Sequence, residues 1–410
     1  MKAEIIAIGS ELLTPFRQDT NSLYLTEQLE RLGIPVMQKT VVGDDRERLK
    51  AAFGDALRRV ELVIGIGGLG PTEDDRTREA VAELLGRKLK REEEVVARME
   101  ERFRARGRKM PEVNLRQAMV PDGADWLPND HGTAPGLWLE TDDQRIVLLL
   151  PGPPPELKPM FEELCLARLR PRAPKHVFAH KVLKTVGLAE SDLEERVAPI
   201  YREYTNPETT ILAAPGQVEI HLRASGADTA EALRRAEELA ERLEQALGDY
   251  VFARGPETLE QVVGLYLMMR GATLAVAESC TGGLVAERLT SVPGSSHYFV
   301  GGITCYAEKL KAKLVGVSPA LLRRKGEVSA EVAAALAQGV RRRTGAVLGL
   351  GITGVAGPTG GTPDKPVGTV CFAWARGGKM VSETRRFEGD RESVRRQSVV
   401  RALQGVLELL

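Results

Sequence analysis

Four short apolar runs lead directly into glycine-rich loops, and a helical pattern of residues follows each loop. Two of these runs lie near the N-terminus, at Ile5–Gly9 and Leu62–Ile66, and two lie in the last third of the chain, at Leu274–Ala277 and Val347–Leu350. Strand, loop and helix in alternation, with short connections, favour parallel βαβ units with helices on both faces of a sheet. The chain is therefore predicted to be an α/β protein whose ligands lie beyond the carboxyl ends of its strands.

Length and punctuation divide the chain into several parts. The 410 residues suit two to three domains, and Pro171–Pro174 and Gly255-Pro256 interrupt the chain. Residues 172–250 follow the order strand, helix, strand, strand, helix, which predicts a small α+β domain between two larger α/β domains. The charged stretch Lys88–Arg106 is predicted to be a solvent-exposed helix. The predicted domain bounds are 1–171, 172–252 and 253–410.

The charge balance and the cysteines limit what the protein does. It has 57 basic and 57 acidic side chains, so bulk positive charge is not available for binding nucleic acid. The middle domain carries more acidic than basic residues and no Gly-x-x-Gly loop, so we expect it to contact another domain or subunit. The four cysteines form no Cys-x-x-Cys pair and are expected to be reduced thiols. No apolar run approaches 18 residues, so we expect a cytoplasmic protein without a membrane span.

The two N-terminal loops bring glycines and carboxylates together. The first contains Glu11 and leads to Asp19 and Asn21, and the second ends in Asp74 and Asp75. Glycines between a strand and a helix let backbone N–H groups approach a phosphate, and Mg2+ bridging carboxylates and phosphate oxygens would explain the aspartates. The alternative is that the aspartates cap helices and the glycines form tight turns. The other candidate residues of the second loop are Gly67, Gly68, Gly70, Pro71 and Thr72.

A serine lies at a strand-to-helix turn in the last domain. Ser279 there suits a nucleophile with backbone N–H donors for an oxyanion, and it suits equally a phosphate cradle without catalysis. No histidine accompanies it. Lys311, close to Tyr306, is the alternative base, because burial lowers the pKa of a lysine; a solvated lysine is the competing interpretation. The residues expected to supply the N–H donors are Thr281, Gly282 and Gly283.

The second loop and the last helix of this domain add candidate phosphate contacts. Arg391 and Arg395 lie four residues apart on one helix face, where they would clamp a phosphate or form surface ion pairs. Cys280, beside Ser279, has no companion histidine or asparagine and is interpreted as inert packing. The candidate loop residues are Thr353, Gly354, Ala356 and Gly357.

The motifs follow a definite order along the chain. From the N-terminus they are Gly9–Leu12, Asp19–Asn21, Gly67–Asp75, Gly132–Gly136, Gly187–Ser191, Ala277–Gly283, Tyr306 with Lys311, Gly354–Pro358, Lys365–Val370 and Gly389–Arg391. Together they resemble CinA, the competence/damage-inducible protein family, over the full length of the chain. The resemblance implies a molybdopterin-binding-like first domain, a KH-type middle domain and a nicotinamide mononucleotide deamidase as the last domain.

What the resemblance implies is an enzyme of pyridine nucleotide salvage with two hydrolytic activities. The last domain would convert nicotinamide mononucleotide to nicotinate mononucleotide and ammonia without a cofactor. The first domain would hydrolyse ADP-ribose to AMP and ribose 5-phosphate with Mg2+. A homodimer is expected, and nucleotides rather than nucleic acids or membranes are the expected partners.

The resemblance also implies roles for particular residues of the last domain. Ser279 would attack the amide carbon after Lys311 takes its proton, with Tyr306 relaying or orienting that proton. An equally economical version has Ser279 positioning a water molecule, without a covalent intermediate. Arg395 and the loop from Thr353 to Gly357 would contact the phosphate and ribose.

In the first domain, Asp75, Asp74 and Asp19 would hold Mg2+, and Glu11 and Asn21 would contact the substrate. Two other classes of function stay open. One is a nucleotide- or pterin-binding scaffold that acts in competence without catalysis. The other is an enzyme that handles molybdopterin, since a fold alone does not fix the chemistry.

Overall fold

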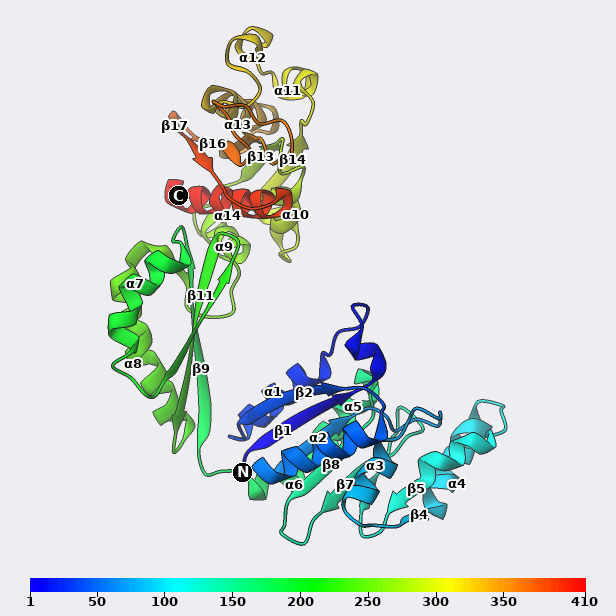
Figure 1. The fold of residues 1–410 in the computed structure, drawn as a ribbon. Helices are drawn as coiled ribbons and strands as arrows, with labels where there is room; N and C mark the ends of the chain where they lie inside the picture. The colour runs from blue at the N-terminus through cyan, green and yellow to red at the C-terminus, as the bar shows by residue number, and fades with distance from the viewer. The chain divides into compact units, whose positions relative to one another are not determined.

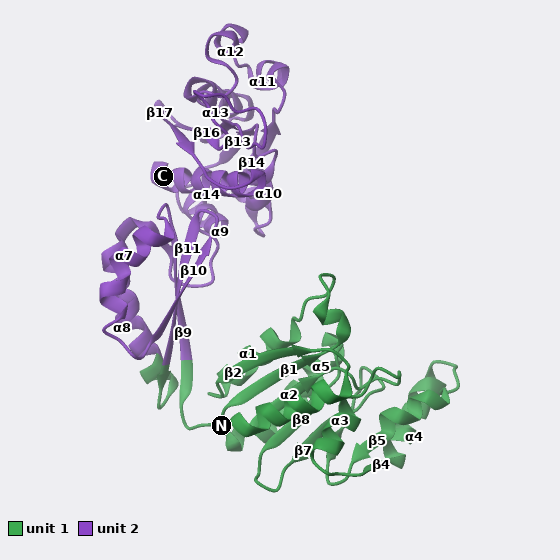
Figure 2. Cartoon of the chain, viewed as in Figure 1, with its two compact units in different colours: residues 1–178, 225–232 green, residues 179–224, 233–410 purple.

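The alternation of apolar strands and amphipathic helices produces three large sheets, one in each predicted domain (Figure 1). The computed structural model describes residues 1–410. Its contacts group into two compact units, residues 1–178 with 225–232 and residues 179–224 with 233–410 (Figure 2). The three sheets confirm the prediction of three α/β or α+β domains.

The sheet of the first domain is mixed rather than wholly parallel. Its strand order is β2-β1-β3-β8-β7-β6, and only the first four strands run parallel. β7 and β6 pair antiparallel because short turns, not helical crossovers, connect the last strands. The prediction of a parallel sheet is therefore wrong at this edge. The strands are β1 (Ala3–Ile8), β2 (Val36–Val42), β3 (Leu62–Ile66), β6 (Asp125–Leu127), β7 (Gly136–Glu140) and β8 (Ile146–Leu150).

Alternate residues of these strands bury opposite faces of the sheet. Ile5 packs with the helices α1 and α5, and its neighbour Ile6 packs with α2 and α3. Helices on both faces leave the loops at the carboxyl ends of β1 and β3 open. The helical segments are η1 (Ser10–Leu13), α1 (Asn21–Arg31), α2 (Arg46–Arg59), α3 (Thr77–Leu84), α5 (Pro154–Met160), η3 (Phe161–Cys165), α6 (Leu166–Leu169) and η4 (Arg170–Arg172).

The charged stretch at residues 88–106 departs from the prediction. It begins with the strand β4 (Leu89–Arg91), which pairs antiparallel with β5 (Met119–Pro121), and only then forms the helix α4 (Glu93–Ala105). Val95, Val96 and Met99 of α4 are buried, packed against the short helix η2 (Glu112–Ala118). The prediction of one solvent-exposed helix is wrong, because apolar residues at helical spacing bury one face of α4.

The middle domain follows the predicted order and adds a strand. Its antiparallel sheet has the order β10-β11-β9-β12, and the helices α7 and α8 share a core with its strands. The elements are β9 (Val177–Val186), α7 (Glu190–Tyr201), β10 (Glu208–Ala214), β11 (Gln217–Gly226), α8 (Thr229–Leu247), η5 (Gly248–Tyr250) and β12 (Val251–Ala253).

The last domain has a second mixed sheet, with the order β14-β13-β15-β16-β17. β13 runs parallel to β14 and β15, whereas β16 and β17 form an antiparallel hairpin that a parallel prediction misses. Helices α9, α10 and α14 cover one face, and α11, α12 and α13 cover the other. The strands are β13 (Leu274–Glu278), β14 (Phe299–Thr304), β15 (Leu348–Gly354), β16 (Thr369–Arg376) and β17 (Lys379–Arg386). The helical segments are α9 (Leu259–Met269), α10 (Leu284–Thr290), η6 (Ser295–His297), α11 (Glu308–Val315), α12 (Pro319–Lys325), α13 (Ala330–Thr344) and α14 (Arg391–Leu409).

Helix α14 packs on two partners. In the last domain, a Cβ atom on Gly405 would lie 2.2 Å from the buried indole of Trp374, so only glycine fits there. Toward the middle domain, a Cβ on Gly216 would lie 3.1 Å from Val400, and one on Gly187 would lie 2.8 Å from the amide of Gln404. The middle domain therefore contacts the last helix directly.

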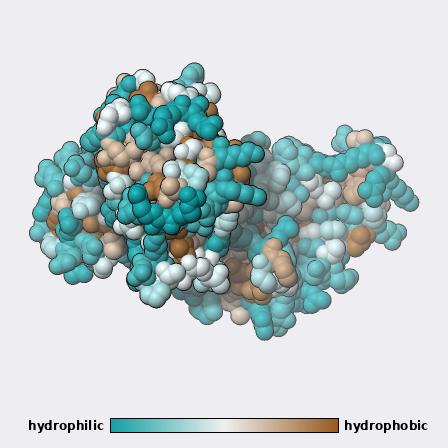
Figure 3. Space-filling view, turned by 90° about the horizontal axis from the view of Figure 1, so that it is seen from above, coloured by the Kyte–Doolittle hydropathy of each residue, from teal (hydrophilic) through white to brown (hydrophobic).

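The surface is largely polar. The face shown in Figure 3 is mostly hydrophilic, with hydrophobic residues scattered across it. None of the helices is both long enough and apolar enough to span a bilayer.

Candidate functional site

A cavity of about 400 Å3 lies at the carboxyl ends of β1, β3 and β8. This first cavity is formed where parallel strands end, which is where open α/β sheets bind ligands. Predicted residues line it together with others that the sequence did not single out. The lining includes Glu11, Gly67, Gly68, Gly70, Pro71, Asp74 and Asp75, and also Asp44, Gln117, Thr133 and Glu156.

The loop that follows β3 presents unused N–H groups. Its carbonyl groups are held from within the protein, because the Thr77 hydroxyl donates to Gly67 O at 3.0 Å and the Arg78 guanidinium donates to Leu69 O at 2.6 Å and Gly70 O at 3.0 Å. The N–H groups of Gly68, Leu69 and Gly70 donate to no protein acceptor. Such a row of free N–H groups is an anion-binding arrangement.

Two features hold this loop in place. Gly68 has a φ of +65°, and a Cβ there would lie 2.0 Å from the Thr77 hydroxyl, so only glycine fits. Arg78 is fully buried, and burial lowers the pKa of its guanidinium. A buried guanidinium that donates to backbone carbonyls is a structural part of the loop rather than a ligand contact.

The charged side chains that line the first cavity are all carboxylates, and Mg2+ prefers oxygen ligands of this kind. Asp75 already accepts hydrogen bonds from the N–H and the hydroxyl of Thr72. No three acidic, histidine or cysteine side chains converge closely enough to hold a metal alone. A Mg2+ ion here would therefore take one or two carboxylates, with substrate phosphate and water completing its shell.

Three predicted residues lie outside the first cavity. The Asp19 carboxylate accepts from the N–H of Ser22 at 3.0 Å at the start of α1 and does not line the first cavity, so its metal role stays a prediction. The Asn21 amide donates to Gly152 O at 2.7 Å, which fixes a cavity-lining residue instead of contacting the cavity itself. Thr72 orients Asp75. Asp44 and Glu156, which the sequence reasoning missed, follow β2 and β8, and the same end-of-strand argument would have found them.

A second site lies at the carboxyl ends of β13 and β15, in a cavity of about 400 Å3. Ser279 directly follows β13 and lines this cavity, called the Ser279 cavity below, with 6% of its surface exposed. Residues from four segments surround it. The lining includes Ser279, Cys280, Tyr306, Glu327, Thr353, Gly354, Ala356, Gly357, Lys365 and Arg391.

The N–H groups at the start of α10, the helix that follows Ser279, already have acceptors within the protein. The buried Glu278 carboxylate accepts from the N–H groups of Gly283, Val285 and Ala286 at 3.0–3.1 Å. The N–H of Gly282 donates to Ser279 O at 3.0 Å. Both glycine N–H groups are thus already donated, and neither these glycines nor Thr281 line the cavity. The role of oxyanion donor stays a prediction for Thr281, and the N–H groups of Gly282 and Gly283 already have acceptors within the protein.

Lys311 is buried, with 1% of its surface exposed. Its ammonium donates to the backbone carbonyl of Tyr306 and to the carboxylate of Glu327, both at 3.0 Å. Lys311 does not itself line the cavity, but both of its partners do. The alternative of a solvated lysine is excluded. Glu327, which follows the turn at Gly326, was not singled out from the sequence.

Tyr306 acts on Lys311 through its main chain. Its hydroxyl, on a side chain that is 58% exposed, accepts from Arg391 at 3.3 Å and bonds to neither Lys311 nor Ser279. A proton relay through the phenol therefore has no hydrogen bond to support it. The orienting role predicted for Tyr306 falls to its carbonyl oxygen.

The loop after β15 forms the facing wall. The Thr353 hydroxyl donates to Glu327 O at 2.7 Å, and Arg391 donates to Gly357 O at 2.8 Å. The N–H groups of Ala356 and Gly357 donate to no protein acceptor. These two groups are free donors in the Ser279 cavity.

The two arginines at the start of α14 behave differently. Arg391 lines the cavity, whereas Arg395 turns away from it and donates to Thr281 O at 2.8 Å. The predicted substrate contact of Arg395 therefore has no support from the cavity lining and stays a prediction. Cys280 is buried, and burial raises the pKa of its thiol to about 12, so it stays protonated and unreactive.

Comparison with known proteins identifies the family of this chain. Three family models match: a "Probable molybdopterin binding domain" over residues 4–171, the "Damage-inducible protein CinA KH domain" over 180–253 and the "CinA C-terminal domain" over 256–410. A CinA-like protein of Koribacter versatilis is 52% identical over 399 residues, 96% of each chain. The chain belongs to the CinA family.

Further relatives cover all or part of the chain. A CinA-like protein of Acidobacterium capsulatum is 51% identical over 99% of each chain. Among solved structures, a CinA protein from Thermoplasma acidophilum, described as of unknown function, is 32% identical with a TM-score of 0.37 and covers 39% of this chain and 94% of its own. A CinA superfamily protein from Escherichia coli is also 32% identical, with a TM-score of 0.36, covering 40% and 98%.

Proposed function

We propose that the last domain hydrolyses the carboxamide of nicotinamide mononucleotide to the carboxylate and ammonia. The observation that carries this proposal is that Ser279 lines the cavity and that both hydrogen-bond partners of the buried Lys311 line it too. A buried lysine whose partners both line a cavity is a candidate for a catalytic role. A catalytic role accounts for that desolvation.

The reaction follows from these groups. Ser279 Oγ attacks the carboxamide carbon, and its proton passes to the neutral amine of Lys311, the proposed base. The free N–H groups of Ala356 and Gly357 stabilise the negative charge on the carbonyl oxygen. The C–N bond breaks, and ammonia leaves with a proton from Lys311. Water then cleaves the ester and restores Ser279.

Two cations of the cavity suit the rest of the nucleotide. Arg391 and Lys365 line it, and each is anchored to a backbone carbonyl, Gly357 O for the arginine and Lys325 O for the lysine. Fixed cations of this kind bind a phosphate monoester. The cavity therefore offers a reacting end at Ser279 and an anion-binding end at Arg391.

Ammonia release from nicotinamide mononucleotide, without added metal, tests this proposal. Ser279→Ala is expected to lose at least ~100-fold in kcat, about 2.7 kcal/mol, while the exposed control Ser296→Ala keeps full activity. Hydroxylamine trapping followed by mass spectrometry distinguishes an acyl-enzyme on Ser279 from direct attack by water. No ammonia from the unaltered protein would refute the proposal and leave a binding module.

The first domain is assigned Mg2+-dependent hydrolysis of ADP-ribose to AMP and ribose 5-phosphate. Its support is the combination of free loop N–H groups with carboxylates, because a pyrophosphate needs both an anion cradle and a cation. Asp74 and Asp75 would hold the ion, which would neutralise the pyrophosphate for attack by water. Loss of AMP formation on adding EDTA, with full recovery on adding Mg2+, is the expected result; metal-independent hydrolysis would refute the assignment.

The location and the assembly belong to the same proposal. All four cysteines are free and buried, as expected of a protein in the reducing cytoplasm. A homodimer is the proposed assembly, and light scattering on the purified full chain measures it.

A further inference from the structure

Strand β10 forms one edge of the sheet in the middle domain. It pairs with β11 alone, in unbroken antiparallel register along all seven of its residues. No other strand lies on its outer side. An edge of this kind presents a row of backbone groups to which a further strand can bond.

The turn between β10 and β11 determines which backbone groups face outward. The turn has two residues, so Ala214 bonds to Gln217 across it. Residues of an antiparallel pair alternate between bonding to the partner strand and pointing away from it. The N–H and C=O groups of Thr209, Ile211 and Ala213 therefore point away from β11, and none of them bonds to another backbone group. The Thr209 hydroxyl is also buried without a hydrogen-bond partner.

The other edge strands of the three large sheets carry features that discourage pairing with a further strand. β17 has four charged side chains among its eight residues. β2 carries Lys39 and β14 carries two adjacent glycines, and each has a register shift against its neighbour. β6 and β12 have only three residues each. In β10, residues 209–214 contain no charge, no proline and no bulge, so this edge is open to pairing.

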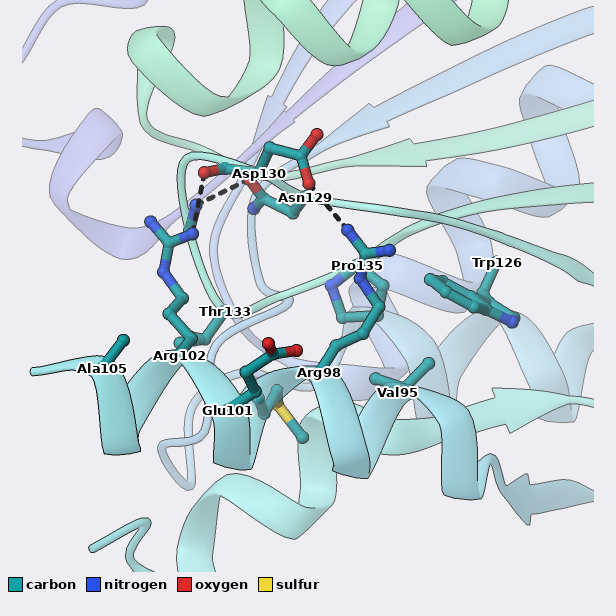
Figure 4. Close-up of a pocket in the computed structure, with 12 residues that line it drawn as sticks. Val95, Arg98, Glu101, Arg102, Ala105, Trp126, Asn129, Asp130, Thr133 and Pro135 are labelled. Carbon is teal, nitrogen blue, oxygen red and sulfur yellow. Dashed lines mark hydrogen bonds and ion pairs between the residues drawn. The ribbon is translucent and has the colours of Figure 1, made fainter. Parts of the chain in front are cut away.

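The side chains of the β10 edge offer no ion pairs to a partner. Other surfaces of the chain are rich in charge: beside α4, for example, Arg98 and Arg102 each donate to Asp130 at 2.7 Å (Figure 4). Along residues 209–214, by contrast, the exposed side chains are those of threonine, leucine and alanine, and Leu212 is 50% exposed. An uncharged edge with unused backbone groups is recognised by another uncharged strand, through main-chain hydrogen bonds.

We propose that β10 pairs antiparallel with β10 of a second copy of this chain, so that the two middle-domain sheets join into one. The strand complements itself. With the two-fold axis at Ile211, Thr209 lies opposite Ala213 of the partner subunit, and the three outward-facing residues of each copy give six main-chain hydrogen bonds. Like charges directly opposite each other would destabilise such a pair, and none meet here. The inference names the surface of the homodimer proposed above and rests on that assembly, not on either hydrolytic activity.

Sedimentation equilibrium on the full-length protein tests this surface. Ala213→Pro removes an outward N–H that no backbone acceptor of the chain uses, and edge strands tolerate proline at such positions. Ala213→Val is the matched control, because it changes the same exposed residue and keeps the N–H. The dimer dissociation constant is expected to rise at least ~10-fold for Ala213→Pro, which loses two of the six bonds, and to stay unchanged for Ala213→Val. Near-ultraviolet circular dichroism checks that each variant keeps its fold.

A disulfide cross-link tests the register without a proline. In the proposed pairing, Thr210 lies opposite Leu212 of the partner subunit as a non-hydrogen-bonded pair, with Cα atoms about 4.5 Å apart, a separation that a disulfide spans. Both residues are exposed, and the four native cysteines are buried. Thr210→Cys mixed with Leu212→Cys should form a disulfide-linked dimer on mild oxidation, whereas each variant alone should form little.

The outcomes separate this surface from the homodimer itself. A monomeric unaltered protein would overturn both. A dimer that Ala213→Pro leaves equally tight would overturn the surface and leave the homodimer standing, as would a mixture of the two cysteine variants that forms no more disulfide than each variant alone. If Ala213→Pro has lost its fold, the cysteine variants decide.

Discussion

Because Lys311 is buried and its partner Glu327 is half-exposed, removing one of them should affect stability differently from removing the other. The Lys311 side chain is 1% exposed, whereas that of Glu327 is 49% exposed. Removing the partner leaves a buried ammonium with only the Tyr306 carbonyl, and removing the lysine leaves a carboxylate that water can reach. Breaking a fully buried pair costs about 3–5 kcal/mol. Because solvent reaches half of Glu327, we expect Glu327→Gln to cost roughly half of that, about 2 kcal/mol.

Lys311→Met is expected to cost less in stability and more in activity. Methionine retains the apolar stem, and the only new defect is one carbonyl without its donor, worth about 1 kcal/mol, which is offset by no longer burying a charge. Ammonia release should nevertheless fall at least ~1000-fold, about 4 kcal/mol. Lys313→Met, an exposed residue of the same helix, is the matched control.

Urea denaturation and ammonia release on the same preparations check both halves of this prediction. The order of unfolding free energies should be Glu327→Gln below Lys311→Met, with Lys313→Met equal to the unaltered protein. A Lys311→Met variant that unfolds more readily than Glu327→Gln would refute the reasoning about the buried charge. One that deaminates at the normal rate would refute the catalytic role.

Three further predictions concern packing, pH and metal. Gly405→Ala should destabilise by about 2 kcal/mol against the Trp374 indole, whereas the helical control Gly54→Ala, with ordinary contacts, should stabilise by about 0.5–1 kcal/mol; thermal melts compare them. Burial raises the pKa of Glu383, but Arg401 outweighs it and holds that pKa below its usual 4.5. The difference in stability between the unaltered protein and Glu383→Gln should therefore be fully present above about pH 4.5 and disappear as the pH falls further. Urea midpoints measured across this pH range test the prediction. Asp75→Asn should abolish Mg2+-dependent ADP-ribose hydrolysis and leave deamidation unchanged, in paired assays.

Features encoded by neighbouring residues were predictable. An apolar strand that ends in glycine identifies the loops around both cavities, because strand, turn and helix signals are local. Asp19 accepts from the N–H of Ser22, as the helix-capping alternative predicts. Glu278, at the end of β13, accepts from three N–H groups at the start of α10, a contact that no capping motif in the sequence indicates. The hairpins β7–β8 and β16–β17 were missed. The buried strands β7, β8 and β16 look alike whether a neighbour runs parallel or antiparallel, and β17 is almost wholly exposed, so no apolar run marks it.

Contacts between distant segments were not predictable. Spacing placed Arg391 and Arg395 on one helix face, but only the packing of α14 decides that the first lines the cavity and the second contacts Thr281. Glu327 meets Lys311 only because helix α11 and the segment after α12 converge. No periodicity reports such a meeting, and a single sequence carries no record of which pairs touch.

Helix α14 contacts both a cavity of the last domain and the middle domain, so its length sets the distance between these two contacts. Arg391 lines the Ser279 cavity and Val400 meets the middle domain, and the nine residue steps from one to the other fix a separation of roughly 14 Å along the helix axis. Adding or deleting one residue in that span would turn one contact by about 100° around the axis relative to the other. Length changes are therefore tolerable at the ends of α14 and in its flanking loops, but not between these two points.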